Sequence, residues 1–241
     1  HPIDFQSEVV FGAGTPVTDA VGVTSAGTGR SAVVLESLRG MRYYNGYLYY
    51  IDTTGVVLFR INVKTWQSEI LAGVPNSVGH TDGTGTSARF NTPNGITVYN
   101  GVVYIGEFQY LRAYDISTRQ VSTMATLLGS TCLSVVATAT DLYASWTDAT
   151  IRQLPITGGA STVIIGNSGT GGILDGDGTA VLMSYPEFSN NSYDTANNTL
   201  YFADNHSIRK VTLVAPYTVT TIAGSGVWDS GAGSYVDGTG S

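Results

Sequence analysis

Residues 93–129 of this 241-residue chain read PNGITVYNGVVYIGEFQYLRAYDISTRQVSTMATLLG. Apolar and polar residues alternate in ITVYN, GVVYIGE and LRAYDI, which is the two-residue period of β-strands. The Asn-Gly pair at 100–101 is a strong signal for a tight β-hairpin, and Ser-Thr-Arg at 117–119 offers another turn. A further turn is expected at the Asn-Gly pair 94–95. The stretch therefore predicts a four-stranded antiparallel sheet joined by short turns.

The second strand of this pattern recurs along the chain. Its copies are GYLYYID (46–52), GVVYIGE (101–107), DLYASW (141–146) and TLYFAD (199–204). The interval of roughly 40 to 60 residues suits four strands and one loop, as in a propeller blade. One such sheet cannot bury both of its faces, so we expect the blades to stack face to face around an axis. The sequence predicts an all-β fold, a β-propeller of four-stranded antiparallel blades with about four blades present.

A glycine-rich polar loop precedes two of the copies, HTDGTGTSARF at 80–90 and LDGDGTAVL at 174–182, and a third such loop, YVDGTGS, occupies 235–241. An acid and an arginine also recur five residues apart across a predicted hairpin. These pairs are Glu107 with Arg112, and Asp204 with Arg209. Repetition from copy to copy favours a structural ion pair. A ring of charges lining one face of the propeller is the functional alternative.

The stretch DGTGTSARFNTPNGITVYNGVVYIGEFQYLRAYD (82–115) resembles an NHL repeat. That family's pattern runs from D-G-x-G-x-x-A-x-F through x-P-x-G-I and Y-V-A-D to I-R-K-I and a closing T-x-A-G. The second copy matches at Asp82, Gly83, Gly85, Ala88, Phe90, Pro93, Gly95, Ile96, Tyr104 and Arg112. The fourth copy matches at Asp175, Gly176, Tyr201, Ala203, Asp204, Ile208, Arg209, Lys210, Ala223 and Gly224. The resemblance spans roughly residues 8–241.

The resemblance implies a ring that usually closes with six blades. We expect a single domain over 1–241, with blades at approximately 9–73, 74–129, 130–166 and 167–226, and the start of a further blade at 227–241. The chain would then be a fragment of a longer protein. A compact ring of four blades and completion by neighbouring molecules are the alternatives. The resemblance fixes no function, because NHL propellers include RNA-binding, adhesion and sensor modules and a metal-dependent lyase.

The charge and composition exclude several classes of function. The net charge is −7 and the only lysines are Lys64 and Lys210, so there is no basic run for a nucleic-acid partner. No stretch of about 20 apolar residues predicts membrane insertion. The low share of charged residues, 12%, favours an extracellular or cell-surface location. Three sequons, at Asn190, Asn197 and Asn205, are candidate glycosylation sites.

Candidate chemistry is sparse. Asp175 and Asp177 alternate like calcium ligands, but an EF-hand loop needs a third ligand and a distant glutamate, so turn-forming aspartates are the alternative. No cofactor is expected beyond this candidate calcium. The three histidines lie far apart along the chain, no nucleophile elbow occurs, and Cys132 is predicted to be a small buried residue.

Aromatic residues outside strands are the remaining candidates, and we predict Trp66 and Trp228 as contact residues. The sequence favours a non-catalytic extracellular or surface-displayed scaffold that binds protein or glycan partners, with self-association into an oligomer or filament as a further option. The alternatives are a propeller enzyme of the lyase or hydrolase type with an axial site, and a ligand-binding sensor domain of a larger receptor.

Overall fold

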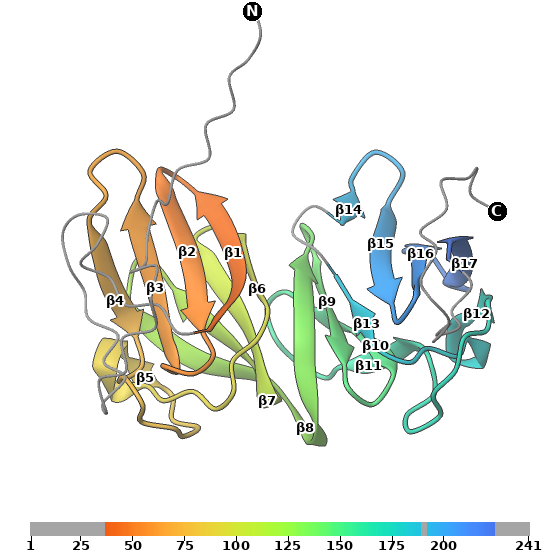
Figure 1. Cartoon of the computed structure of the whole chain (residues 1–241), viewed down its shortest axis with the longest axis horizontal. Helices are drawn as coiled ribbons and strands as arrows, with labels where there is room; N and C mark the ends of the chain where they lie inside the picture. The colour runs from red at the N-terminus through yellow and green to blue at the C-terminus, as the bar shows by residue number, and fades with distance from the viewer. Residues whose placement is uncertain (1–36, 189–191, 225–241) are drawn as a thin grey trace, which may run out of the picture.

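The computed structural model describes residues 37–188 and 192–224. These residues form antiparallel sheets and two short 3-10 turns, η1 (Gly85–Ser87) and η2 (Gly178–Ala180). Figure 1 shows the sheets side by side in an arc, the first two blades on the left and the last two on the right. Within the described ranges, no helix is long and apolar enough to cross a membrane.

The first blade is a four-stranded sheet in simple chain order. Its strands are β1 (Leu38–Tyr44), β2 (Tyr47–Asp52), β3 (Val57–Asn62) and β4 (Ser68–Ala72). Asn45 and Gly46 join β1 to β2 with φ angles of 46° and 83°. Two positive φ angles are what a type I′ hairpin turn requires, and asparagine followed by glycine tolerates them best.

The second and third blades belong to one seven-stranded sheet. Its strands are β5 (Gly83–Thr84), β6 (Ile96–Tyr99), β7 (Val102–Asp115), β8 (Gln120–Ala137), β9 (Asp141–Trp146), β10 (Thr150–Pro155) and β11 (Thr162–Ile165). The Asn-Gly pair at 100–101 joins β6 to β7 with φ angles of 46° and 81°, so the predicted hairpin is confirmed.

Two long strands explain the size of this sheet. Strand β7 doubles back on itself, because the N–H of Ile116 donates to the carbonyl of Gly101. In β8, Val121 pairs with β7 of the second blade, whereas Val136 pairs with β9 of the third. The third copy has no Asp-Gly loop, so β8 runs directly from one blade into the next.

The fourth blade contains β15 (Thr199–Asp204), β16 (Ser207–Thr212) and β17 (Thr218–Ala223). Two short strands, β13 (Pro186–Glu187) and β14 (Tyr193–Asp194), both pair with the inner edge of β15. Strand β12 (Gly176–Asp177) pairs with β17, as β5 pairs with β8. The Asp-Gly loops before the second and fourth blades therefore each add a short strand to the outer edge of their blade.

The expected turn at residues 94–95 is wrong. The N–H of Asn94 donates to the carbonyl of Gly106, and Gly106 donates back to Gly95, so both residues hydrogen-bond to β7 just before β6 begins. Gly95 has another role, because a Cβ there would lie 2.7 Å from the carbonyl oxygen of Leu133. The glycine allows the inner strands of the second and third blades to approach closely.

The hydrophobic cores lie between the blades. Tyr49 packs between the first and second blades, Tyr104 between the second and third, and Tyr143 between the third and fourth. These equivalent tyrosines are 2%, 4% and 5% exposed. The blades therefore stack face to face, and a repeated tyrosine on each hallmark strand contacts the next blade.

The fourth blade breaks this pattern on its far side, which we call the open face and define by Tyr201 and Ile208. Tyr201, the equivalent of the three core tyrosines, is 37% exposed. Ile208 is 50% exposed, whereas its equivalents Leu111 and Ile151 are fully buried. The described residues place no further blade against this face.

Candidate functional site

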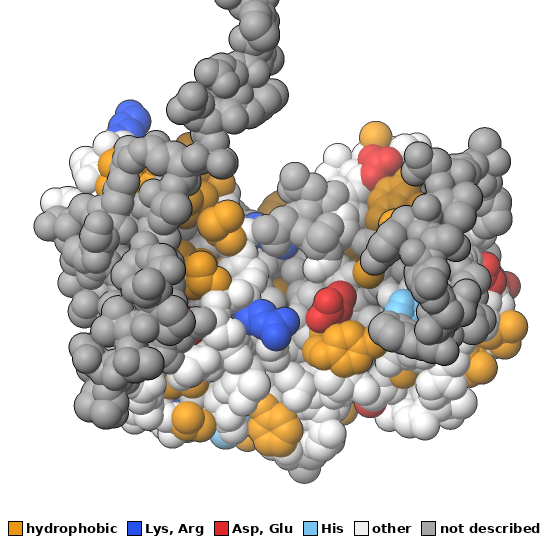
Figure 2. Space-filling view, in the orientation of Figure 1, with side chains coloured by type: hydrophobic (Ala, Val, Ile, Leu, Met, Phe, Trp, Pro, Cys, Tyr) orange, Lys and Arg blue, Asp and Glu red, His pale blue; other side chains and the backbone are white. Residues whose placement is uncertain are grey.

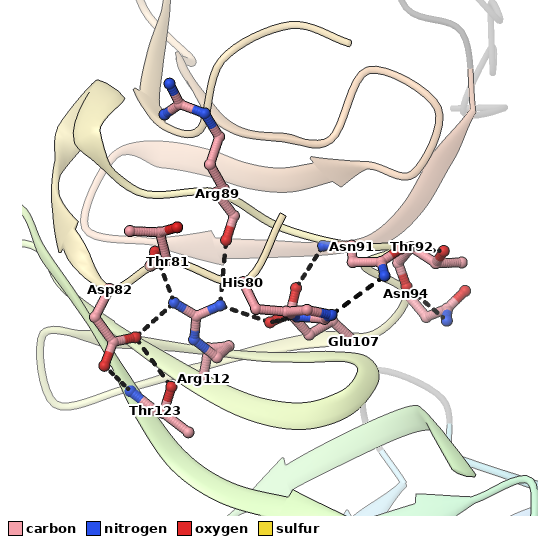
Figure 3. A network of polar contacts seen from close by, with 10 residues as sticks. All are labelled: His80, Thr81, Asp82, Arg89, Asn91, Thr92, Asn94, Glu107, Arg112 and Thr123. Atoms are coloured by element: carbon pink, nitrogen blue, oxygen red, sulfur yellow. Dashed lines mark hydrogen bonds and ion pairs between the residues drawn. The ribbon is translucent and has the colours of Figure 1, made fainter. Parts of the chain in front are cut away.

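A buried arginine cluster holds the Asp-Gly loop against the second blade (Figure 3). Arg112 Nη1 donates to Glu107 Oε1 and its Nη2 to Asp82 Oδ1, both at 2.6 Å. The same guanidinium also donates to the carbonyls of Thr81 and Arg89 at 3.0 and 3.2 Å. Burial raises the pKa of Glu107, while Arg112 and the Asn91 N–H oppose the rise. The cluster joins the loop to both arms of the β7 hairpin, next to its bend.

The fourth blade contains the same cluster. Arg209 donates to Asp204 at 2.7 Å and to Asp175 at 3.0 Å. It also donates to the carbonyls of Leu174 and Leu182. These contacts correspond one by one to those of the second blade, and none of these residues lines the axial cavity described below. A contact set repeated between blades is typical of a structural role.

The candidate calcium ligands already have protein partners. The Asp175 carboxylate accepts from the Thr221 N–H at 2.7 Å and the Thr221 hydroxyl at 2.9 Å, in addition to Arg209. Burial works against its ionisation, but these donors hold the pKa of Asp175 below its usual value. Asp177 accepts from the Thr218 hydroxyl. In residues 37–188 and 192–224, no three His, Cys, Asp or Glu side chains gather as metal ligands do, and calcium binding stays a prediction.

The first and third blades lack this arginine cluster. In the first blade Phe59 replaces the arginine, and the Asp52 carboxylate instead accepts the backbone N–H groups of Thr54 and Gly55. In the third blade Trp146 replaces the acid, and Arg152 donates to Asp148 at 3.3 Å. The sequence pattern of acid and arginine therefore marks the two blades that carry an Asp-Gly loop.

A cavity of about 370 Å³ lies where the inner strands of all four blades meet. Figure 2 shows this hollow between the two halves of the molecule, with basic and acidic side chains visible in it. The charged lining residues are Arg39 and Arg42 from β1 and Glu187 from β13. Asn94 and Ser134, from the inner strands of the second and third blades, also line it. We call this cavity the axial pocket.

The polar residues that line the axial pocket differ from blade to blade. In three blades the lining residue pairs with the next-to-last residue of a hallmark strand: Arg39 with Ile51, Ser134 with Ser145 and Glu187 with Ala203. In the second blade both Asn94 and Gly95 hydrogen-bond to Gly106 and line the pocket. The Ser134 hydroxyl serves blade packing, because it contacts Ser145 Oγ at 2.6 Å and accepts from the Phe188 N–H at 2.8 Å. Arg39, Asn94 and Glu187 therefore bring a cation, an amide and an anion to one cavity from three different blades.

A β-bulge directs two arginines into the pocket. In a regular strand Arg39 and Arg42 would point to opposite faces, because side chains alternate. The register shifts between Arg39 and Met41, and Gly40 in the bulge has a φ of 60°. A bulge with glycine in the left-handed region inserts one extra residue. This insertion changes the alternation, so both arginines line the same cavity.

Among the described residues, the pocket arginines have no carboxylate partner. Arg42 is half-buried, and burial lowers its pKa to about 10. Its guanidinium donates to the carbonyl of Met41 at 3.2 Å. No carboxylate of the described residues lies within ion-pair distance of Arg39 or Arg42. Burial and Glu187 raise the pKa of Tyr185 while Arg39 lowers it, which places these charges near one another.

One histidine links the second-blade arginine cluster to the pocket wall (Figure 3). His80 Nδ1 lies 3.6 Å from Glu107 Oε1, and its Nε2 lies 3.2 Å from the Asn91 amide nitrogen. Asn91 in turn accepts from the hydroxyl of Thr92, which lines the axial pocket. Thr92 has a φ of 47°, a conformation that a β-branched residue rarely adopts. In the fourth blade Ile173 stands in place of His80, so this link is not repeated there.

The other predicted site residues are dispersed. Trp66 lies in the turn between β3 and β4 and packs, partly buried, against the first-blade cluster of Tyr50 and Phe59. Asn197 and Asn205 are exposed at hairpin turns flanking β15, and both are accessible to modification. Trp228 and Asn190 lie outside the described residues.

Sequence reasoning missed the pocket residues Arg39, Arg42, Tyr185 and Glu187. They precede the hallmark strands and do not belong to the repeated motif, so a search for repeats passes over them. Comparing the inner strands of the four copies would have shown that their charged residues differ from blade to blade.

Comparisons with known proteins show the fold. No protein-family model matches the sequence, and no curated protein matches it. An auxiliary nutrient binding protein from Bacteroides thetaiotaomicron is similar in structure, with 16% identity and a TM-score of 0.51. The alignment covers 79% of this chain and 58% of that one.

Two other solved structures are similar. A nidogen/laminin complex matches with 10% identity and a TM-score of 0.59, covering 80% of this chain and 67% of that one. A virginiamycin B lyase from Staphylococcus aureus matches with 11% identity and a TM-score of 0.54, covering 77% and 55%. The chain therefore spans between about half and two thirds of the length of these proteins. It is an all-β protein with the antiparallel β-propeller fold.

Proposed function

We propose that the protein is a non-catalytic binding scaffold whose ligand site is the axial pocket. The observation that carries this proposal is that Arg39, Asn94 and Glu187, from three different blades, line one cavity with groups of different charge. The volume of about 370 Å³ lies within the range of roughly 300 to 1,000 Å³ that is typical of small-molecule sites. A glycan unit or a short segment of a protein partner fits such a pocket better than a folded surface does.

We further infer that the chain is an NHL-like propeller that works outside the cell or at its surface. The repeated arginine clusters support the family, because they are built from the residues that the NHL pattern shares with this chain. The exposed Asn197 and Asn205, in sequons, and the low content of charged residues support the location. The similar nutrient binding protein agrees with a binding role.

An enzyme with its site at the axis is the second candidate. Two lyases among the similar structures favour it, and Glu187 and Tyr185 supply groups that could exchange a proton with a ligand. Against it, the described lining of the pocket contains one carboxylate and no histidine, whereas glycoside hydrolysis generally uses two carboxylates.

A glycan and peptide array tests the binding proposal. We expect the protein to retain a ligand, and Arg42→Ala with Glu187→Ala to abolish retention. The matched control is Arg119→Ala with Glu69→Ala, an exposed ion pair outside the pocket lining. Thermal unfolding of both double variants checks that they remain folded. Retention that survives loss of the pocket charges would refute the axial site.

Mass spectrometry of the retained ligand separates the two candidates. The binding proposal predicts that the ligand is recovered unchanged after long incubation with the protein. A product that accumulates with time, and that disappears with Glu187→Ala, would establish the enzyme instead.

A further inference from the structure

The described residues that line the axial pocket carry an excess of one positive charge, in a protein whose net charge is −7. Arg39 and Arg42 are its two cations, and Glu187 is its one described carboxylate. Neither arginine forms an ion pair with a described carboxylate, as shown above. Arg42 is half-buried and Arg39 is exposed beside it. A half-buried cation without a carboxylate partner is costly, so this arrangement favours an anionic ligand.

The type of cation indicates the type of anion. Guanidinium groups match planar carboxylates with two parallel hydrogen bonds, whereas an ammonium group acts as a point charge. A ligand with one negative charge would neutralise the net charge of this pocket. Glu187 repels any anion in the pocket, and it repels a dianion such as phosphate more strongly than a monoanion.

The rest of the lining suits hydroxyl groups. Thr92, Asn94, Thr131 and Thr147 bring hydroxyls and an amide to the pocket. The Thr92 hydroxyl donates to Asn91 and the Asn94 amide to the Thr92 carbonyl, but each group has further hydrogen-bonding capacity. Tyr185 adds a ring that is 48% exposed and can stack against an apolar face of a ligand. Hydrogen-bonding groups that surround a stacking ring are what a sugar requires.

We propose that the axial pocket binds a carboxylate-bearing sugar, with the carboxylate held by Arg39 and Arg42. Glu187 accepts hydrogen bonds from sugar hydroxyls, and Tyr185 stacks on the ring. This inference rests on the proposed binding function and specifies its ligand class. The bulge at Gly40 is the local device that brings the two arginines together on one side of β1.

Calorimetric titration with matched small molecules tests the inference. The probes are galacturonate, galactose as its neutral counterpart, and N-acetylalanine as a carboxylate without a sugar ring. We expect galacturonate to bind at least about tenfold more tightly than either of the others, as paired charged hydrogen bonds allow. Its affinity should fall as salt concentration rises.

Three variants assign the roles of the residues. Arg39→Gln and Arg42→Gln should each weaken galacturonate binding by about tenfold or more and leave galactose binding unchanged. Glu187→Gln should not weaken galacturonate binding, because it removes the repulsion between Glu187 and the carboxylate of the sugar. Arg119→Gln is the control, since Arg119 is exposed and lies outside the pocket lining.

The outcomes separate the two proposals. Equal affinity for galactose and galacturonate, or equal affinity for N-acetylalanine, overturns the acidic-sugar inference and leaves the binding function standing. Galacturonate binding that ignores both arginine substitutions also overturns it. If the array finds no ligand that depends on the pocket charges, and no probe binds, both proposals fail.

Discussion

At the scale of single residues, one dipeptide has two different roles in this fold. The Asn-Gly pair at 100–101 is a hairpin turn, as its two positive φ angles show. The pair at 94–95 hydrogen-bonds to Gly106 of β7, and Gly95 permits the backbone of the neighbouring blade to approach closely. The sequence predicts the first role from local turn chemistry. The second depends on a strand about 40 residues later and has no local signal.

Protonation of Asp175 should weaken the fold in acid. Because its folded-state pKa lies below the usual value of 3.8, the unfolded chain binds the proton more tightly than the folded protein does. Stability should therefore be present above about pH 4 and fall as the pH decreases through the folded pKa. Urea unfolding between pH 2 and pH 7 should show a shallower acid slope for Asp175→Asn than for the unmodified protein. Parallel slopes would contradict the assignment.

Cys132 should be inert in the folded protein. It is fully buried, as the sequence predicts, and burial raises its pKa far above the usual value. The thiolate is the reactive form, so a maleimide should modify the folded chain only as fast as it opens. Labelling in increasing urea should follow the unfolding transition measured by tryptophan fluorescence. Rapid labelling without denaturant would show that the second and third blades separate readily.

At the scale of elements, the arginine cluster should stabilise the second blade through a buried charge pair. Arg112→Met leaves Glu107 buried beside His80 and the Asn91 N–H alone. Breaking such a pair from one side costs about 3 to 5 kcal/mol. Arg119→Met removes an exposed arginine and should change the free energy of unfolding by about 0.5 kcal/mol or less. Chemical denaturation of both variants measures the difference, and equal costs would refute the structural role.

The open face makes a second prediction for the elements. Leu111→Ala should cost about 2 to 5 kcal/mol, because this side chain is buried between the second and third blades. Ile208 occupies the equivalent strand position on the fourth blade. Because Ile208 is half exposed, Ile208→Ala should lower the free energy of unfolding by only about 0.5 kcal/mol or less. A large cost at Ile208 would mean that another segment or molecule covers this face.

The elements themselves were largely predictable. Strand alternation, the Asn-Gly turns and the five-residue spacing of acid and arginine are local signals, and the structure contains the strands and both ion pairs. The continuity of β8 was not evident, because Gly129 reads as the end of a strand. Because the third copy lacks an Asp-Gly loop, β8 continues from the second blade directly into the third.

At the scale of the whole molecule, the repeats predict the propeller but not its site. The fold follows from positions that recur, such as Tyr49, Tyr104 and Tyr143. The axial pocket depends on positions that differ between copies and on a bulge at Gly40. These residues form one cavity only when the four inner strands are brought together around one axis. The sequence has no local signal for this, and it favoured Trp66 and Trp228 instead. The contact roles of those two tryptophans stay predictions.

Self-association also stays a prediction, and it concerns the open face rather than the pocket. Light scattering over a concentration series should give a particle mass that rises if neighbouring molecules cover Tyr201 and Ile208. Ile208→Glu should then return the mass to that of one chain. A constant monomeric mass would separate the open face from any assembly.

Hydroxyl-radical footprinting with a ligand retained by the array tests the central claim most directly. It compares two tyrosines of similar exposure, Tyr185 in the axial pocket and Tyr201 on the open face. The axial site predicts that saturating ligand slows oxidation of Tyr185 and leaves Tyr201 unchanged. Protection of Tyr201 with no change at Tyr185 would contradict the account and place recognition on the open face of the fourth blade.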